Sequence, residues 1–168
     1  ALPIGNGSLG AMIYGGLPVY QCSLNLDNLW SGRPGRNEHV AVSEEKRQAV
    51  LDALGEGNRK KTQNAPVFLI SAVILNRAGF QKDGSADNEL GNGWGCYDLG
   101  LQNENLILKA TDLGLSTLIM GLREADRLRE ILNIPETETI VSVIAVGKAA
   151  EEPIRPHRKP IEEIAKFF

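Results

Sequence analysis

The chain has 168 residues, a formal net charge of -3 and a hydrophobic content of 42%. A chain of this length can form one domain that buries about 70% of the surface exposed by the unfolded chain. The weakly acidic balance provides no basic surface for nucleic acid or an anionic membrane. No apolar run reaches the roughly 20 residues needed to cross a bilayer, so neither partner is expected.

Cysteine and histidine are scarce, with Cys22, Cys96, His39 and His157 as the whole set. The two cysteines belong to no CxxC pair, and a domain of this size does not need a disulfide, so free thiols are expected. No cluster has metal-ligand spacing, and we expect no zinc site. Residues 1–16 lack the basic region and clean apolar core of a signal peptide, which favours a cytoplasmic protein.

Residues 1–40 differ in composition from the rest and are expected to form a separate, irregular glycine-rich segment. Two short strands are predicted at 11–14 and 19–26, with Gly15 and Gly16 as a turn signal between them. Residues 5–10 satisfy the GxGxxG pattern of dinucleotide sites. That pattern requires a strand before it and a helix after it, and neither is predicted here, so we reject dinucleotide binding.

Residues 41–168 alternate between helical and strand patterns, which predicts an α/β domain. A helix should begin after Ser43 and end at Gly55 or Gly57. The β-branched run 67–75 predicts a strand buried on both faces. The polar segment 76–95 predicts a long loop, either functional or disordered. The remaining expected elements are a helix at 97–113, a strand at 116–120, a helix at 122–133, a strand at 139–147 and a short helix from Pro160.

Two stretches near the start, LPIGNGSLGAMIYGG and LNLDNLWSGRPGRN, resemble the N-terminal segment of family-95 glycoside hydrolases of the α-L-fucosidase type. The resemblance covers about residues 2–37 and implies common ancestry or a fusion. Glycoside hydrolysis requires two carboxylates across the sugar, and this region offers only Asp27, with Glu38 just beyond it. The resemblance therefore implies no activity by itself.

Three later stretches carry a longer resemblance: EEKRQAVLDALGEGNRKKTQNAPVFLISAV, WGCYDLGLQNENLILKATDLGLSTLIMG and LREADRLREILNIPE. Together with TIVSVIAVGKAAEEP and HRKPIEEIAKFF they are similar to the FMN-dependent nitroreductase family over residues 42–168. The resemblance implies an α/β (α+β) fold, a mixed sheet flanked by helices, and an intertwined homodimer. The family's N-terminal Arg-x-Ser-x-Arg-like phosphate motif has no counterpart in residues 1–40.

The same resemblance implies a flavin site. Ile119, Met120 and Gly121 correspond to the turn whose backbone N–H approaches flavin N5, and Gly121 would let the backbone come close to the ring. Arg158 corresponds to a basic residue on the FMN phosphate, a role suited to a guanidinium. Asn58 is a weaker candidate for the pyrimidine edge. Without the resemblance, Met120 and Gly121 would be interpreted as the end of a strand. Arg158 would belong to a solvated basic tail, and Asn58 would be a helix-ending turn residue.

Three functions remain open at this point. The first is an FMN-dependent NAD(P)H oxidoreductase that reduces nitroaromatic, quinone or similar acceptors by a ping-pong mechanism. The second is a non-catalytic fusion with a nitroreductase-like scaffold and no flavin. The third is a carbohydrate-binding fragment of a glycoside hydrolase. The first agrees with the lack of a catalytic triad or carboxylate pair, because hydride transfer to a flavin requires no side-chain acid or base.

Overall fold

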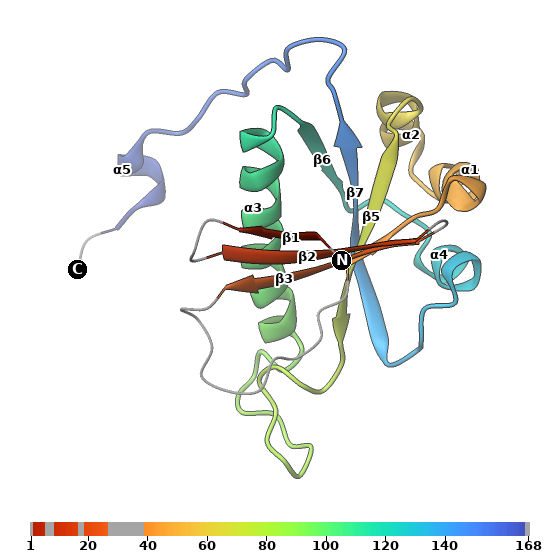
Figure 1. The fold of residues 1–168 in the computed structure, drawn as a ribbon. Coiled ribbons are helices and arrows are strands. Elements are labelled where there is room, and N and C mark those ends of the chain that lie inside the picture. Colours follow the sequence, from red (N-terminus) through yellow and green to blue (C-terminus); the bar gives the residue numbers. More distant parts are fainter. Residues whose placement is uncertain (1, 6–8, 17–18, 27–38, 167–168) are drawn as a thin grey trace.

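The computed structural model describes the backbone of residues 2–5, 9–16, 19–26 and 39–166, and side chains from Val42 onward. Its strands form one sheet in the order β1-β2-β3-β4-β5-β7-β6 (Figure 1). The strands are β1 (Leu2–Gly5), β2 (Leu9–Gly16), β3 (Val19–Leu26), β4 (His39–Ala41), β5 (Val67–Ile74), β6 (Ser116–Met120) and β7 (Glu138–Gly147). The strands expected at 11–14, 19–26, 67–75, 116–120 and 139–147 all form.

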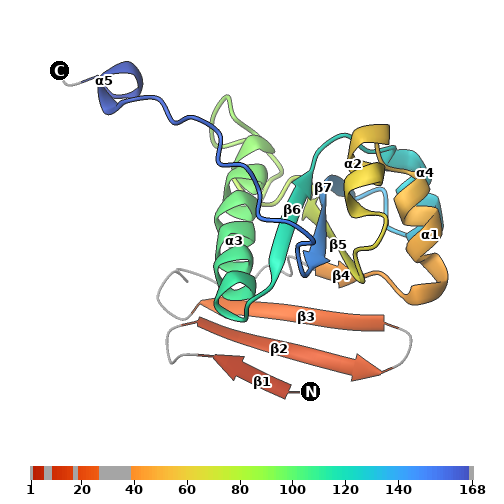
Figure 2. The same cartoon turned by 90° about the horizontal axis from the view of Figure 1, so that it is seen from above.

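The helices cover both faces of the β5–β7–β6 part of the sheet (Figure 2). They are α1 (Glu44–Asp52), α2 (Glu56–Thr62), α3 (Gly93–Asp112), α4 (Ala125–Leu132) and α5 (Ile161–Ile164). The long helix α3 lies on one face, and α1, α2 and α4 lie on the other. The predicted α/β fold class is therefore confirmed. None of the helices in the described ranges is long and apolar enough to cross a membrane.

Strand β7 decides how the central strands pair. It lies between β5 and β6 and is antiparallel to both, so β5 and β6 run in the same direction without touching. Every pairing between neighbouring strands in the described residues is antiparallel. The resemblance implied a mixed sheet, and the described pairings differ from that expectation because β7 separates the two co-directional strands.

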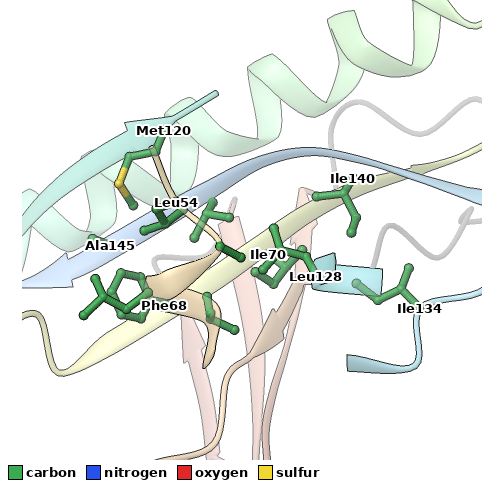
Figure 3. Close-up of a cluster of buried hydrophobic side chains, with 12 residues drawn as sticks. Leu54, Phe68, Ile70, Met120, Leu128, Ile134, Ile140 and Ala145 are labelled. Atoms are coloured by element: carbon green, nitrogen blue, oxygen red, sulfur yellow. The ribbon is translucent and has the colours of Figure 1, made fainter. Parts of the chain in front are cut away.

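The main hydrophobic core lies between the sheet and α1 and α4 (Figure 3). Alternate residues of β5, Phe68 and Ile70, point into it, as the two-residue period of a strand requires. Leu128 of α4 is fully buried in the same cluster beside Ile70, and Met120 enters the cluster from β6. Each such side chain contributes about 1.5–3 kcal/mol by leaving water. The remaining buried members are Val50, Leu51, Ala53, Leu54, Ile134, Ile140, Val143 and Ala145.

The opposite face of the sheet carries a polar contact to α3. Ser71 of β5 and Ser142 of β7 are paired across the ladder and both are buried. The Ser71 hydroxyl donates to Oδ1 of the buried Asn103 of α3 at 3.1 Å. A buried hydroxyl without a partner would cost about 1–3 kcal/mol, so this bond fixes α3 at one position along β5.

The segment between β5 and α3 was expected to be a functional or disordered loop, and it forms a hydrogen-bonded turn structure. Phe80 and Ala86 form an isolated antiparallel bridge, and Nε1 of Trp94 donates to Asn88 Oδ1 at 2.8 Å. Within the tip, hydrogen bonds from the Ser85 side chain and backbone lower the pKa of the Asp83 carboxyl. The loop is thus held by its own side chains.

Several boundaries differ from the predictions. The helix expected to run to Gly55 or Gly57 ends at Asp52, and a second helix, α2, follows it. Residues 121–124 are extended, and Arg123 forms a bridge with Leu54, so α4 begins at Ala125 and not at 122. In addition, β2 continues through Gly15 and Gly16, which pair with β3 and do not form a turn.

Candidate functional site

The end of β6 presents the first three predicted site residues. Ile119 is 49% exposed, whereas Met120 is 1% exposed and Gly121 is again exposed. This alternation follows from the pleat of a strand, which directs successive side chains to opposite faces. The Met120 side chain therefore belongs to the core (Figure 3). Its neighbours on either side are accessible.

The segment that follows β6 is held by the carbonyl groups of Gly121 and Leu122 and by the Glu124 N–H. The Gly121 carbonyl accepts a hydrogen bond from Arg123 Nη1 at 3.0 Å. The Leu122 carbonyl accepts from the Gly55 N–H at 3.0 Å, and the Glu124 N–H donates to the Ala53 carbonyl at 2.8 Å. Residues 121–124, called the turn below, are thus hydrogen-bonded to the junction between α1 and α2.

Three other N–H groups of the same segment are unpaired within the described residues. Those of Gly121, Leu122 and Arg123 donate to no acceptor within the described ranges. A Cβ built on Gly121 would meet no atom within 4 Å, so space is open beside the backbone there. Backbone donors that are accessible and unpaired suit the acceptor atoms of a ligand.

Helix α2 brings Asn58 to the neighbourhood of this turn. Thr62 Oγ1 donates to the Asn58 carbonyl at 2.9 Å, and the same hydroxyl lies 3.9 Å from Met120 Sδ. Asn58 occupies the third position of α2 and is half-buried, so the interpretation of Asn58 as a helix-ending turn residue is wrong. The residue as a whole remains partly accessible.

Arg158 is not brought to the other four residues. It belongs to the exposed segment between β7 and α5, and α5 lies beyond α3, on the side away from α2 (Figures 1 and 2). The same segment and helix expose large apolar side chains, with Ile154 95% exposed and Ile161 and Ile164 also exposed. Within one chain, the predicted phosphate residue is therefore separate from the predicted turn.

Three residues of this region were not predicted from the sequence: Gly55, Thr62 and Arg123. Gly55 was expected only to end a helix, yet it is the N-cap of α2, and its N–H binds the turn. Thr62 contacts Met120, which lies 58 positions later in the chain. Arg123 contacts Ile140, which lies 17 positions later. No local pattern indicates such contacts. No group of three or more His, Cys, Asp or Glu side chains that could hold a metal ion is found among the described residues.

Comparison with solved structures gives similar folds. A nitroreductase family protein from Streptococcus pneumoniae matches with a TM-score of 0.64 and 19% identity, covering 77% of this chain and 78% of that one. Nitroreductase A from Vibrio parahaemolyticus matches with a TM-score of 0.64 and 25% identity, covering 77% and 56%. An oxidoreductase containing FMN matches with a TM-score of 0.59 and 23% identity, covering 76% and 68%.

Comparison with curated proteins gives no match. These comparisons lend no support to the glycoside hydrolase resemblance of residues 2–37. The sequence model of the nitroreductase family matches residues 27–148, more than two thirds of the chain. The chain therefore belongs to the nitroreductase family.

Proposed function

We propose that this chain is an FMN-dependent NAD(P)H oxidoreductase that reduces nitroaromatic, quinone or similar acceptors. The observation that carries the proposal is the set of three unpaired backbone N–H groups at 121–123, next to the open space beside Gly121. Membership of the nitroreductase family and the fold shared with an FMN-containing oxidoreductase support it. When bound, FMN would supply the chemistry of hydride transfer.

The residues of the chain would hold and orient the flavin. Ile119, Met120 and Gly121 would form the turn beside N5, with the buried Met120 side chain anchoring that turn in the core. Gly121 would let the ring approach the backbone, because no Cβ stands in the way. Asn58 would offer its partly accessible amide to the pyrimidine edge. No side chain of this set needs to exchange a proton with the acceptor.

We further propose that the chain acts as a homodimer in which Arg158 serves the flavin of a second copy. Arg158 belongs to the segment that leads from β7 to α5, and α5 lies beyond α3, on the side away from α2, which supports this assignment (Figures 1 and 2). The exposed Ile154, Ile161 and Ile164 would then be covered by the second copy, removing apolar surface from water. A cytoplasmic location is also proposed, and the free, exposed thiol of Cys96 agrees with a reducing compartment.

Titration with FMN tests the role of the turn directly. Gly121→Pro removes the N–H and should weaken FMN binding about tenfold, whereas Gly121→Ala keeps the N–H, adds only a methyl group beside the ring and should weaken binding less. The preceding Met120 is already in a strand, the conformation that a following proline favours. Dissociation constants from flavin fluorescence quenching measure the difference. Equal losses in both variants would argue against the donor role.

A second titration tests Arg158. Arg158→Ala should weaken FMN binding about tenfold, because a guanidinium–phosphate contact is a charge-assisted hydrogen bond. Arg155→Ala is the matched control, since Arg155 is an equally exposed arginine three positions earlier in the same segment. Sedimentation or scattering gives the oligomeric mass of each variant. A monomeric protein that still loses affinity on Arg158→Ala would contradict the assignment to a second copy.

The competing hypotheses predict other results. A colourless purified protein that ignores added FMN would leave the non-catalytic scaffold as the better description. Heat released on titration with fucosylated glycans would favour the carbohydrate-binding fragment. The division into residues 1–40 and 41–168 stays a prediction, and expression of 41–168 alone with a cooperative unfolding transition would support it.

A further inference from the structure

Arg123 occupies an unusual position beside the turn. Its guanidinium is half-buried and donates to two backbone carbonyls, those of Gly121 through Nη1 and of Ile140 through Nη2. Its Nε atom is buried and has no hydrogen-bond partner among the residues that the structure describes. None of the ion pairs in the described part of the chain involves Arg123. The cation is therefore held by carbonyl dipoles and not by a carboxylate.

The two bonds have a direct geometric consequence. The Gly121 carbonyl belongs to the peptide group that also carries the Leu122 N–H, and a peptide group is planar. A bond that fixes this carbonyl therefore fixes the direction of the Leu122 N–H, which points the opposite way. The second bond, to Ile140, ties the same side chain to the central strand β7.

The other contacts of the turn leave this task to Arg123. The bonds from Gly55 to the Leu122 carbonyl and from Glu124 to the Ala53 carbonyl connect the turn to α1 and α2. Neither of them reaches the peptide group between Gly121 and Leu122. Beyond Met120, which ends β6, the backbone of this segment makes no ladder contact with β7. The Arg123 side chain supplies the missing connection to the sheet.

We propose that Arg123 is a positioning residue that holds the Leu122 N–H in the direction needed by the flavin. This inference rests on the proposed function, because it concerns the same turn. Arg123 itself does not contact the reacting atoms. A lysine at this position could reach one carbonyl but could not bridge two with a planar fork. Arg123 therefore governs how well the turn is preorganised.

Other arginines show what a purely structural role looks like. Arg129 donates to the carbonyls of Ile134, Pro135 and Glu138 and closes the connection between α4 and β7. Arg127 donates to the Asp52 carbonyl at 3.2 Å and pairs with Glu124 at 3.7 Å. Arg127 thus joins α4 to α1 without touching residues 121 and 122, which makes it a matched control.

The experiment compares Arg123→Met, Arg123→Lys and Arg127→Met with the unsubstituted protein. Amide hydrogen exchange of Gly55 and Glu124 is measured without flavin, because both N–H groups depend on the position of the turn. FMN dissociation constants and the visible spectrum at saturating FMN are measured next. Thermal unfolding of each protein shows how far any loss is global. Arg123→Lys keeps the charge and is the variant used if Arg123→Met fails to fold.

The inference predicts a specific pattern. Arg123→Met should raise the exchange rate of the Gly55 and Glu124 amides and the FMN dissociation constant by about tenfold each, and shift the bound-flavin spectrum. Arg123→Lys should recover part of each change, and Arg127→Met should leave the affinity within about twofold. Unchanged affinity and spectrum in Arg123→Met, with normal binding by the unsubstituted protein, would overturn the inference alone. No FMN binding by the unsubstituted protein would overturn the proposed function and the inference with it.

Discussion

Leu128→Ala is expected to lower the free energy of unfolding by about 2–5 kcal/mol. Leu128 is 0% exposed and belongs to the core on the α1–α4 side of the sheet, beside Ile70 (Figure 3). Removing its isobutyl group costs the hydrophobic transfer term and leaves a cavity that the rigid sheet cannot fill. Since small domains are stable by only about 5–15 kcal/mol, this loss is a large fraction of the total.

Urea unfolding followed by circular dichroism measures this change, and Leu122→Ala is its control. Leu122 is 75% exposed and lies six positions earlier, so its removal should change the free energy of unfolding by less than about 0.5 kcal/mol. The pair keeps the chemistry of the substitution constant and varies only burial. Similar losses in both variants would mean that α4 is not packed as the structure describes.

Gly79→Ala should destabilise the protein by about 2–5 kcal/mol, and Gly84→Ala by only about 1–2 kcal/mol. Both glycines have positive φ, +76° and +86°, so an alanine is strained at either position. They differ in their surroundings. A Cβ on Gly79 would lie 2.5 Å from Trp94 Cδ1, whereas a Cβ on Gly84 would meet nothing within 4 Å.

The difference between these two variants isolates the contact between the loop and α3. Trp94 cannot move freely, because its Nε1 donates to Asn88 and its ring packs edge-on against Tyr97. We expect the larger loss in Gly79→Ala to appear in urea unfolding, together with a change in the near-ultraviolet aromatic signal. Equal losses would show that backbone strain alone accounts for both and that Trp94 adjusts.

The elements with strong periodic patterns were predictable from the sequence. The β-branched runs of β5 and β7 and the apolar stripe of α3 each extend over eight or more residues, so tertiary contacts reinforce the local preference. Helix α2 was missed because it has seven residues, three of them basic, and only Thr62 is buried. The glycines at 55 and 57 were predicted to end the preceding helix, whereas Gly55 is the N-cap of α2.

The start of α4 shows how tertiary contacts override a local pattern. Residues 122–124 carry the helical spacing of the segment that follows them, and the sequence predicts a helix from 122. The bridge between Leu54 and Arg123 keeps these residues extended, since their backbone groups bond to residues 53–55 instead of to a helix. A local propensity of a few tenths of a kcal/mol cannot compete with two backbone hydrogen bonds to residues 53–55.

For this protein, the sequence by itself determined the family, the α/β class and the strand 116–120 that leads into the turn, because each depends on the order and type of residues along the chain. Only the tertiary structure decided which backbone groups of that turn are bonded and which remain available. Gly55, Thr62 and Arg123 come to the turn from other elements or across a bend of the chain. The segment that follows β7, to which Arg158 belongs, leads to α5 beyond α3 (Figures 1 and 2). Such contacts arise from the path of the chain, so residue spacing alone does not predict them.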